Sequence, residues 1–297
     1  MQKKNSYILL AIVLLITLIS GGLYFCLYLK NINNTIHLKK ISHQVLLKKA
    51  DVPVINVVSS TMPKLEKGQV NFAILLYHHI GTFNPNIKYY KLSVSTSSFE
   101  RQISYLTEKG YKFMKLKDAC DYAKINSTTP AKTVILTFDD GYRDFYTNAY
   151  PILKKYNVPA TFFIITSDIG KRGNVTWGMM KELNGSGLVE IGSHTVNHLD
   201  LDKLTQEKIV AQLQDSKMIL EKNLGLTIFS LSYPFGYFNN EVEKIASAIG
   251  YEGAVGIFSG AYPGGHDEFN WRRVKISDYD LGANFMKRLY SAFGRKI

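Results

Sequence analysis

The chain has 297 residues, 46% of them hydrophobic, and a formal net charge of +12 at pH 7. This length suffices for one large domain with a sizeable core and additional segments. Seven lysines and no acidic residue lie between Met1 and Ala50, and residues 51–70 are neutral, so the remaining chain carries only about +5. The excess charge therefore adjoins an apolar segment and forms no basic groove, so we expect no nucleic-acid partner.

The first predicted element is a membrane anchor at residues 7–29, which contain no charged side chain over 23 positions. As a helix this segment is about 34 Å long, enough to cross a hydrocarbon core of roughly 30 Å. Lys3 and Lys4 would also suit a cleaved signal peptide. The apolar run, however, exceeds the roughly 7–15 residues of such a peptide, and no small-x-small cleavage site follows it. We therefore predict a short cytoplasmic end at residues 1–6 and one uncleaved transmembrane helix.

The orientation of this anchor does not follow from charge alone. Lysines flank the apolar run on both sides, so the positive-inside rule gives no single answer. Long C-terminal domains cross the membrane largely regardless of such charges. We expect a single-pass protein of the cell membrane with its large domain outside the cell.

Residues 30–70 are basic and polar, with two prolines and no clear period, which predicts a stalk. From residue 71 to residue 297, short apolar runs alternate with amphipathic segments, as expected for one domain. The runs predict strands at 72–77, 133–138, 160–165, 188–192, 229–233, 253–257 and 272–276, and the amphipathic segments predict helices near 97–109, 143–156, 176–186, 204–224 and 239–249.

Strands that alternate with helices pair in parallel through helical crossovers. Seven such strands fit either an open doubly wound sheet or a closed or nearly closed barrel. In both folds the chemistry collects just past the carboxyl ends of the strands. The residues that follow each predicted strand are therefore the candidates for a functional site.

Two carboxylates follow the strand predicted at 133–138. Asp139 and Asp140 precede Gly141, and Asp-Gly is common turn chemistry. Adjacent carboxylates at the end of a buried strand repel each other, however, and need a cation or a proton nearby. The stretch therefore favours a functional site over a simple turn.

Two histidines, His194 and His198, follow the strand predicted at 188–192. If the loop opens with a helical turn, their i, i+4 spacing places both rings on one face, as a divalent metal requires. Alone, such a pair is more often an ordinary pair of polar surface residues. Beside an acidic strand end, two imidazoles and one carboxylate form a facial triad with open positions.

Other strand ends hold single candidates. The run at 72–77 ends in His78 and His79. After the strand at 229–233, Pro fixes the chain, and the next backbone N–H, on Phe235, is a candidate oxyanion donor, although the same sequence also suits a plain turn.

Near the last strand, Trp271 either lines a sugar-binding groove or packs in the core. One of Arg272 and Arg273 is expected to pair with a carboxylate of the site. Tyr233, Pro234 and Trp271 are the candidate substrate contacts.

Three motifs occur in a fixed order: TFDDG at 137–141, SHTVNH at 193–198 and YPFG at 233–236. Together they resemble the motifs of the polysaccharide deacetylases of carbohydrate esterase family 4, the NodB-homology enzymes. The similarity covers about residues 131–297 strongly and 71–130 more loosely.

The resemblance implies an α/β fold, a distorted (β/α)7-type barrel, here preceded by one transmembrane helix. It also implies metal-dependent removal of N-acetyl groups from amino-sugar polymers. Carried over by motif, Asp140, His194 and His198 would hold one divalent ion, with Zn favoured and Co, Ni or Mn compatible. Asp139 would be the general base.

The chain departs from the usual family pattern at two points. Ser232 occupies the position of an arginine that braces the base in ordinary members, and no Leu-x-His motif follows Trp271. Deacetylases of poly-β-1,6-N-acetylglucosamine, a biofilm exopolysaccharide, have a rearranged motif order that accounts for both. By that resemblance, Leu76-Tyr77-His78 supplies the general acid, His78, and Arg273 orients the base.

The expected function is therefore N-deacetylation of a cell-surface N-acetylglucosamine polymer, most of all poly-β-1,6-N-acetylglucosamine, on a Gram-positive-type cell. Exopolysaccharide synthesis or export machinery is a candidate partner. Peptidoglycan or chitin oligomers remain alternative substrates. A membrane-tethered polysaccharide-binding module without turnover is the alternative from a different functional class.

Overall fold

The computed structural model describes residues 72–82, 90–125, 127, 129–257 and 268–293. The predicted anchor and stalk lie outside these ranges, and their assignment stays a prediction. Within the described ranges, no helix has both the length and the apolar character needed to cross a membrane.

The core of the domain is one sheet of parallel strands in the order β10-β1-β5-β6-β7-β8-β9. Strand β4 pairs with the first half of β5, and β6 pairs with the end of β5. A separate pair, β2-β3, is also parallel. The strands are β1 (Phe72–Tyr77), β2 (His79–Ile80), β3 (Ser93–Val94), β4 (Lys112–Met114), β5 (Thr133–Phe138), β6 (Ala160–Ile164), β7 (Val189–Ser193), β8 (Ser230–Ser232), β9 (Gly253–Val255) and β10 (Val274–Lys275).

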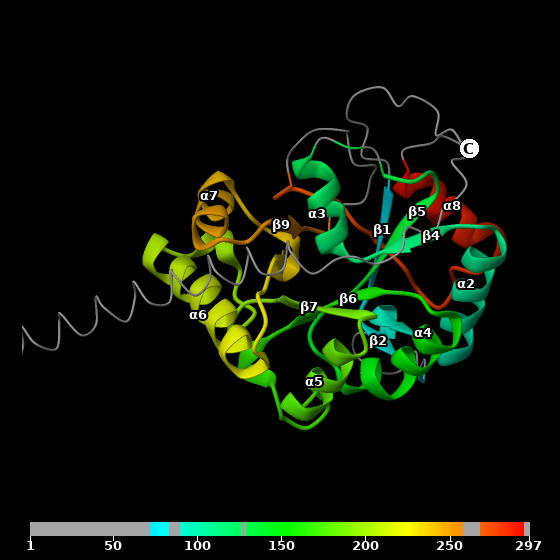
Figure 1. Cartoon of the computed structure of the whole chain (residues 1–297), viewed down its shortest axis with the longest axis horizontal. Coiled ribbons are helices and arrows are strands. Elements are labelled where there is room, and N and C mark those ends of the chain that lie inside the picture. Colours follow the sequence, from blue (N-terminus) through cyan, green and yellow to red (C-terminus); the bar gives the residue numbers. More distant parts are fainter. Residues whose placement is uncertain (1–71, 83–89, 126, 128, 258–267, 294–297) are drawn as a thin grey trace, which may run out of the picture. The chain divides into compact units, whose positions relative to one another are not determined.

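Helices surround this sheet (Figure 1). They are α2 (Thr96–Glu108), α3 (Leu116–Lys124), α4 (Tyr150–Tyr156), α5 (Trp177–Gly185), α6 (Gln206–Leu224), α7 (Asn240–Ile249) and α8 (Gly282–Ala292). Short helical turns complete the described chain: η1 (Tyr90–Leu92), η2 (Phe145–Ala149), η3 (Thr166–Asp168), η4 (Leu201–Lys203) and η5 (Pro234–Gly236).

Local chemistry defines where several helices begin and end. The side chain of Asn239 accepts hydrogen bonds from the backbone N–H groups of Glu241 and Val242 and so caps α7. Gly225 and Gly250 end α6 and α7 in the left-handed conformation, which glycine adopts without steric cost.

Strand residues alternate between two apolar layers, because successive side chains of a strand point to opposite faces. In β1, Ala73 and Leu75 face the helices, whereas Phe72 and Ile74 face the inside of the curled sheet. The inner layer also contains Leu116, Ala119, Cys120 and Ala123 of α3, together with Trp271. Helix α3 therefore packs against the inner face of the sheet.

The two edges of the sheet approach each other through one segment. Trp271 forms a parallel bridge with Val255 of β9, and four residues later Lys275 pairs with Leu76 of β1. The sheet is therefore a curled, partly closed barrel, and the alternative of an open doubly wound sheet is wrong.

The predicted parallel α/β architecture is confirmed, and all seven predicted strands are present. The strand predicted at 272–276 is reduced to β10, because the preceding residues contact β9 instead. Strands β2, β3 and β4 and helix α8 were not predicted. The segment predicted as one helix at 143–156 consists of the π-helical turn η2 followed by α4.

Candidate active site

A cavity of about 540 Å³ lies at the carboxyl ends of the strands. The residues that line it come from loops and strand ends all around the curled sheet, as the parallel topology predicts. They are Leu76, His78, Leu92, Asp139, Asp140, Tyr142, Ile165, Asp168, His194, His198, Phe235, Ile257 and Lys275.

Asp139 lies at the base of this cavity with only 1% of its surface exposed. Arg273 donates two hydrogen bonds to its carboxylate, from Nη1 to Oδ1 and from Nη2 to Oδ2, each at 2.7 Å. Burial alone would raise the pKa of Asp139, but the charge of Arg273 and the nearby imidazoles outweighs it and holds the pKa below its usual value. The carboxylate is therefore ionised near neutral pH, as a general base must be.

Arg273 is itself fully buried and fixed by further contacts. Its Nε donates to the backbone carbonyl of Gly256 at 2.8 Å, and its Nη1 donates to Thr137 Oγ1 at 3.2 Å. Ser232 fills the space beside the pair: Arg273 Nη2 donates to Ser232 Oγ at 2.9 Å, and that hydroxyl donates to Asp139 Oδ2 at 3.0 Å. The arginine next to Asp139 thus comes from the end of the chain, whereas Arg272 is exposed.

Asp140, His194 and His198 form a compact cluster, in which one ligand atom of each lies within 4.8 Å of the others. Asp140 Oδ1 is 3.4 Å from Nε2 of His194 and 3.7 Å from Nε2 of His198. His194 Nδ1 donates to the carbonyl oxygen of Ser232 at 2.7 Å, which leaves Nε2 as the free ligand atom. One carboxylate and two imidazoles with this arrangement suit a divalent ion.

The electrostatics of the cluster also suit a cation. Burial would lower the pKa of His194, but the charges of Asp139 and Asp140 outweigh it and the pKa is raised. Burial would raise the pKa of Asp140, but His194 and the other imidazoles hold it well below its usual value. The site thus attracts positive charge, and a dication can replace the proton on the imidazole.

His78 opens into the same cavity from the end of β1, with 8% of its surface exposed. Burial lowers its pKa to about 4, and the opposing effect of Asp139 and Asp140 does not compensate. The ring is therefore neutral near neutral pH. Its neighbour His79 lies outside the cavity lining, with Nδ1 2.6 Å from Asp144 Oδ2.

Backbone strain is concentrated at this site. Six non-glycine residues in the described chain have φ between +50° and +75°, and four of them are Asp140, Thr195, His198 and Phe235. Such strain persists only where the surrounding structure enforces it, and it is common at functional sites. The φ of 58° turns Phe235 in η5 toward the cavity, and the two hydrogen bonds of this turn come from Gly236 and Tyr237, so the Phe235 N–H is not used by them.

The candidate substrate contacts lie deeper than expected. Tyr233 is fully buried, Pro234 is buried and Trp271 is 1% exposed, with its ring edge-on to Phe72 at 5.2 Å between centroids. Trp271 packs in the core, and none of these three residues is among those that line the cavity, so their assignment as sugar contacts stays a prediction that the structure does not support. The aromatic residues that line the cavity are Tyr142 and the half-exposed Phe235.

Several residues that line the cavity were not predicted from the sequence. Tyr142 follows the acidic motif directly, so its proximity could have been inferred from that motif. Lys275 lies two residues beyond Arg273, and the alternation of strand side chains places both on one face. Leu92 ends η1 and Ile257 follows β9, and only the fold brings these two segments to the cavity.

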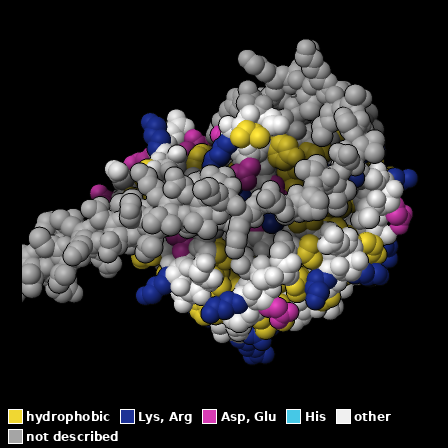
Figure 2. Space-filling view, in the orientation of Figure 1, with side chains coloured by type: hydrophobic (Ala, Val, Ile, Leu, Met, Phe, Trp, Pro, Cys, Tyr) yellow, Lys and Arg dark blue, Asp and Glu magenta, His cyan; other side chains and the backbone are white. Residues whose placement is uncertain are grey.

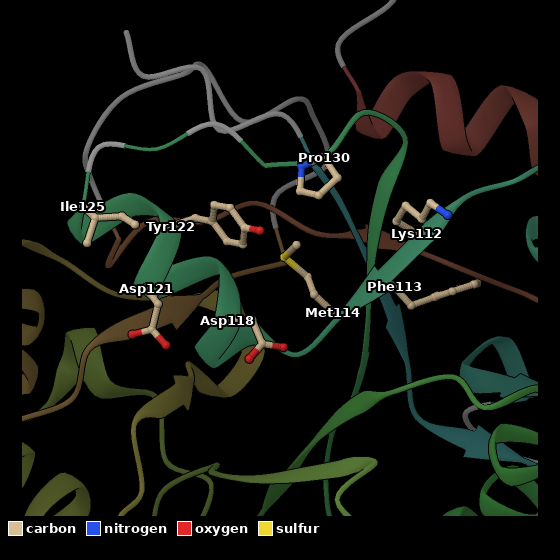
Figure 3. Close-up of a pocket in the computed structure, with 8 residues that line it drawn as sticks. All are labelled: Lys112, Phe113, Met114, Asp118, Asp121, Tyr122, Ile125 and Pro130. Carbon is tan, nitrogen blue, oxygen red and sulfur yellow. The ribbon is translucent and has the colours of Figure 1, made fainter. Parts of the chain in front are cut away.

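A second cavity, of about 530 Å³, lies away from this chemistry, between β4 and α3 (Figure 3). Its acids, Asp118 and Asp121, both come from α3, and no histidine or cysteine joins them in the lining. On the face shown in Figure 2, lysine and arginine side chains are scattered and form no continuous basic patch. The cavity at the carboxyl strand ends is therefore the candidate active site.

Comparisons with known proteins agree on one family. The family model described as polysaccharide deacetylase matches residues 126–254. The chain is 34% identical to YxkH of Bacillus subtilis, whose name assigns it provisionally to the polysaccharide deacetylases, over 76% of this chain and 78% of that protein. It is 32% identical to the poly-beta-1,6-N-acetyl-D-glucosamine N-deacetylase of Staphylococcus aureus, over 76% of this chain and 86% of that protein.

A solved structure gives the same result. The Streptococcus pyogenes deacetylase PplD, in complex with acetate, superposes with a TM-score of 0.68 at 30% identity, over 74% of this chain and 99% of that one.

Proposed function

The chain belongs to the polysaccharide deacetylase family of hydrolases, and from this premise we propose that it removes N-acetyl groups from poly-β-1,6-N-acetylglucosamine in a metal-dependent reaction. The observation that carries the proposal is that Asp139, paired with the buried Arg273, lines the same cavity as the cluster of Asp140, His194 and His198. An ionised base next to a cation-binding cluster is what amide hydrolysis requires.

The residues of the cation-binding cluster fit one divalent ion, with zinc favoured and cobalt, nickel or manganese compatible with the same donors. When bound, such an ion supplies Lewis-acid polarisation and a more acidic water. Asp140, His194 and His198 would hold it, and the hydrogen bond from His194 Nδ1 to Ser232 orients the His194 ring for that task.

The protein side chains would carry the proton transfers. Asp139, held by Arg273, takes a proton from the attacking water as the water oxygen bonds to the acetamide carbon. The backbone N–H of Phe235 donates to the oxygen that becomes negative. His78 delivers a proton to the nitrogen as the carbon–nitrogen bond breaks, which yields acetate and a glucosamine amine.

The low pKa of His78 couples these steps. Because the ring is neutral near neutral pH, it must gain a proton before it can protonate the nitrogen, and in this proposal Asp139 passes on the proton that it took from the water. The base and the acid thus act in sequence on one proton.

The choice of polymer rests on the relative from Staphylococcus aureus, whose name specifies poly-β-1,6-N-acetylglucosamine, and on the early position of His78. We further propose that the domain works outside the cell, held to the membrane by residues 7–29 through the stalk at 30–70. Exopolysaccharide synthesis or export machinery would then be its neighbour.

The decisive experiment measures acetate release by the full chain, solubilised in a neutral detergent, from β-1,6-linked and β-1,4-linked N-acetylglucosamine oligomers, with and without a chelator. The proposal expects release from the β-1,6 oligomers that stops with chelator and returns with added zinc. Faster release from β-1,4 oligomers would indicate a peptidoglycan or chitin substrate instead. Binding of oligomers without any acetate release would indicate a polysaccharide-binding module.

A matched pair of variants separates the base from the ion-binding cluster. Asp139→Asn should lower turnover by about 10³-fold while the metal stays bound, and His194→Ala should lose both turnover and the metal. Near wild-type acetate release by Asp139→Asn would show that the assignment of the base is wrong.

A further inference from the structure

The three carboxylates that line the active-site cavity all have a partner of opposite charge or an imidazole beside them. Asp139 is paired with Arg273 at 2.7 Å, and Asp168 is paired with Lys171 at 2.8 Å. Asp140 lies against His194 and His198. Each carboxylate of the cavity lining therefore already has a partner within the protein.

Lys275 is the lining residue for which the described structure offers no such partner. No carboxylate of the described residues forms an ion pair with it, and the charged neighbours that influence it are Lys91 and Arg288, both cations. Arg288 itself contacts Asp280, Nε to Oδ1 at 3.2 Å, so part of its charge is shared. Burial, followed by the repulsion from these two cations, lowers the pKa of Lys275.

The position of Lys275 follows from the register of β10. Arg273 and Lys275 are two positions apart along an extended segment, so their side chains point to the same face. Arg273 reaches Asp139 at the base of the cavity, and Lys275, paired in register with Leu76, lies one step farther toward the carboxyl end of the strand. Lys275 thus lies on the wall of the cavity, one step nearer its mouth along the strand than the residue that holds Asp139.

We propose that Lys275 is a specificity-determining residue, which favours polymer segments whose sugars still carry neutral acetamides and disfavours segments that already carry free glucosamine amines. This inference rests on the proposed function of the same site. It concerns which segment of the polymer the enzyme accepts, and not the chemistry of the reacting bond.

The chemistry of the product supplies the reason. Each turnover converts a neutral acetamide into a primary amine, which takes up a proton near neutral pH. A unit positive charge on a neighbouring sugar would then lie near the unbalanced charge of Lys275, and like charges in a partly desolvated cleft repel. A neutral acetamide, by contrast, offers a carbonyl oxygen to which the ammonium group can donate a hydrogen bond.

The test compares two β-1,6-linked tetrasaccharides, one fully acetylated and one with a single free amine beside the reacting sugar. The full chain in neutral detergent is assayed for acetate release from each at low ionic strength. We expect kcat/KM for the fully acetylated oligomer to exceed that for the cationic oligomer by about fivefold. The ratio should fall toward one at an ionic strength of about 0.5 M, where charges more than a few ångströms apart are screened.

Variants of Lys275 decide whether this residue is the cause. Lys275→Met keeps the length of the side chain without its charge, and the ratio should fall to about one. Lys275→Glu should reverse it in favour of the cationic oligomer. Lys112→Met is the matched control, because Lys112 is an exposed lysine of β4 beside the second cavity, outside the active-site lining, and its ratio should equal that of the wild type.

The outcomes are distinct from those of the proposed function. An equal ratio in the wild type and both Lys275 variants, or a wild type without preference, overturns the proposal while acetate release still supports the deacetylase function. If no oligomer releases acetate, the proposed function fails, and the same ratio is then measured as equilibrium binding of the two oligomers. Equal binding of both by the wild type would overturn the selection as well.

Discussion

Two acidic side chains face the inside of the curled sheet, one toward each end, and their surroundings differ in one respect. Asp139, at the carboxyl end, is paired with the cation of Arg273. Glu190, near the amino end of β7, accepts hydrogen bonds only from neutral groups: Ser230 Oγ at 2.6 Å, Thr161 Oγ1 at 2.9 Å and the backbone N–H of Lys117 at 3.0 Å. Both carboxylates are satisfied, but only one has a charge partner.

The difference indicates separate roles for the two residues, a catalytic role for Asp139 and a structural role for Glu190. The cation holds the pKa of Asp139 below its usual value, so the carboxylate is available as a base. Burial raises the pKa of Glu190, and its hydrogen bonds compensate only in part. Glu190 instead fixes the first turn of α3, because its carboxylate accepts from a backbone N–H at the start of that helix.

The strongest test of this division compares the two amide variants in the acetate assay. Asp139→Asn should lower kcat by about 10³-fold, within the range for loss of a general base. Glu190→Gln should retain most of the wild-type kcat, because Glu190 lies outside the cavity lining. Comparable losses of kcat in both variants would contradict the assignment of a catalytic role to Asp139 and a structural role to Glu190.

The next largest effect is expected when the cation is removed. Arg273→Met leaves Asp139 buried without a charge partner, which should lower the free energy of unfolding by about 3–5 kcal/mol. Loss of the cation also raises the pKa of Asp139, so the acidic limb of the activity profile should move to higher pH. Urea unfolding and a pH–rate profile measure the two effects.

A conservative variant keeps this prediction testable if Arg273→Met does not fold. Arg273→Lys retains the charge but not the two parallel hydrogen bonds, and it should lie between wild type and Arg273→Met in both measurements. An acidic limb that stays in place in the lysine and methionine variants would show that Arg273 does not control the base.

The contribution of Glu190 to stability should depend on pH in the opposite direction to that of Asp139, because the pKa of Glu190 is raised and that of Asp139 is lowered. A carboxyl group whose pKa is raised on folding stabilises the folded state below its unfolded pKa, and this contribution is lost as pH rises through the folded pKa. Glu190→Gln has no such contribution and loses hydrogen bonds, at a cost of about 1–3 kcal/mol at acidic pH. Its stability deficit should therefore shrink as pH rises through the raised pKa of Glu190.

Denaturant unfolding at several pH values measures this deficit. Glu182→Gln, an exposed glutamate that accepts a hydrogen bond from Tyr146, provides the control, and its smaller deficit should not change with pH in the same direction. A deficit of Glu190→Gln that grows as pH rises would show that Glu190 is ionised and stabilising in the folded protein.

The sequence predicted the strands and the strand-end residues well, for a physical reason. Buried parallel strands are continuous apolar runs, and FAILLY and TVILTF are both buried at every position. The residues that follow them lie in one cavity because parallel strands end at the same edge of the sheet. Asp139, Asp140, His194 and His198 could therefore be brought together without coordinates.

Contacts that depend on closure of the sheet were harder to predict. Whether Trp271 faces a groove or the core depends on its bridge to Val255 across the edges of the sheet, which no local pattern encodes. The ionisation of His78 depends on how deeply the cavity is enclosed. The role of Glu190 was missed because a single acid within an apolar strand has no sequence signal for its three donors.

The smallest effect on stability is expected at an ion pair on the surface of α3, a second contact of this helix besides the hydrogen bond to Glu190. Lys124 of α3 forms an ion pair with Glu252, Nζ to Oε2 at 2.8 Å, and about half of the Lys124 side chain is exposed. Exposed pairs of this kind contribute less than about 1 kcal/mol and weaken in salt. Lys124→Met should therefore reduce the free energy of unfolding less than Glu190→Gln does at acidic pH, with unchanged acetate release. If the surface variant proved the more damaging, α3 would be held mainly by its ion pairs, and the interior carboxylate would not be its anchor.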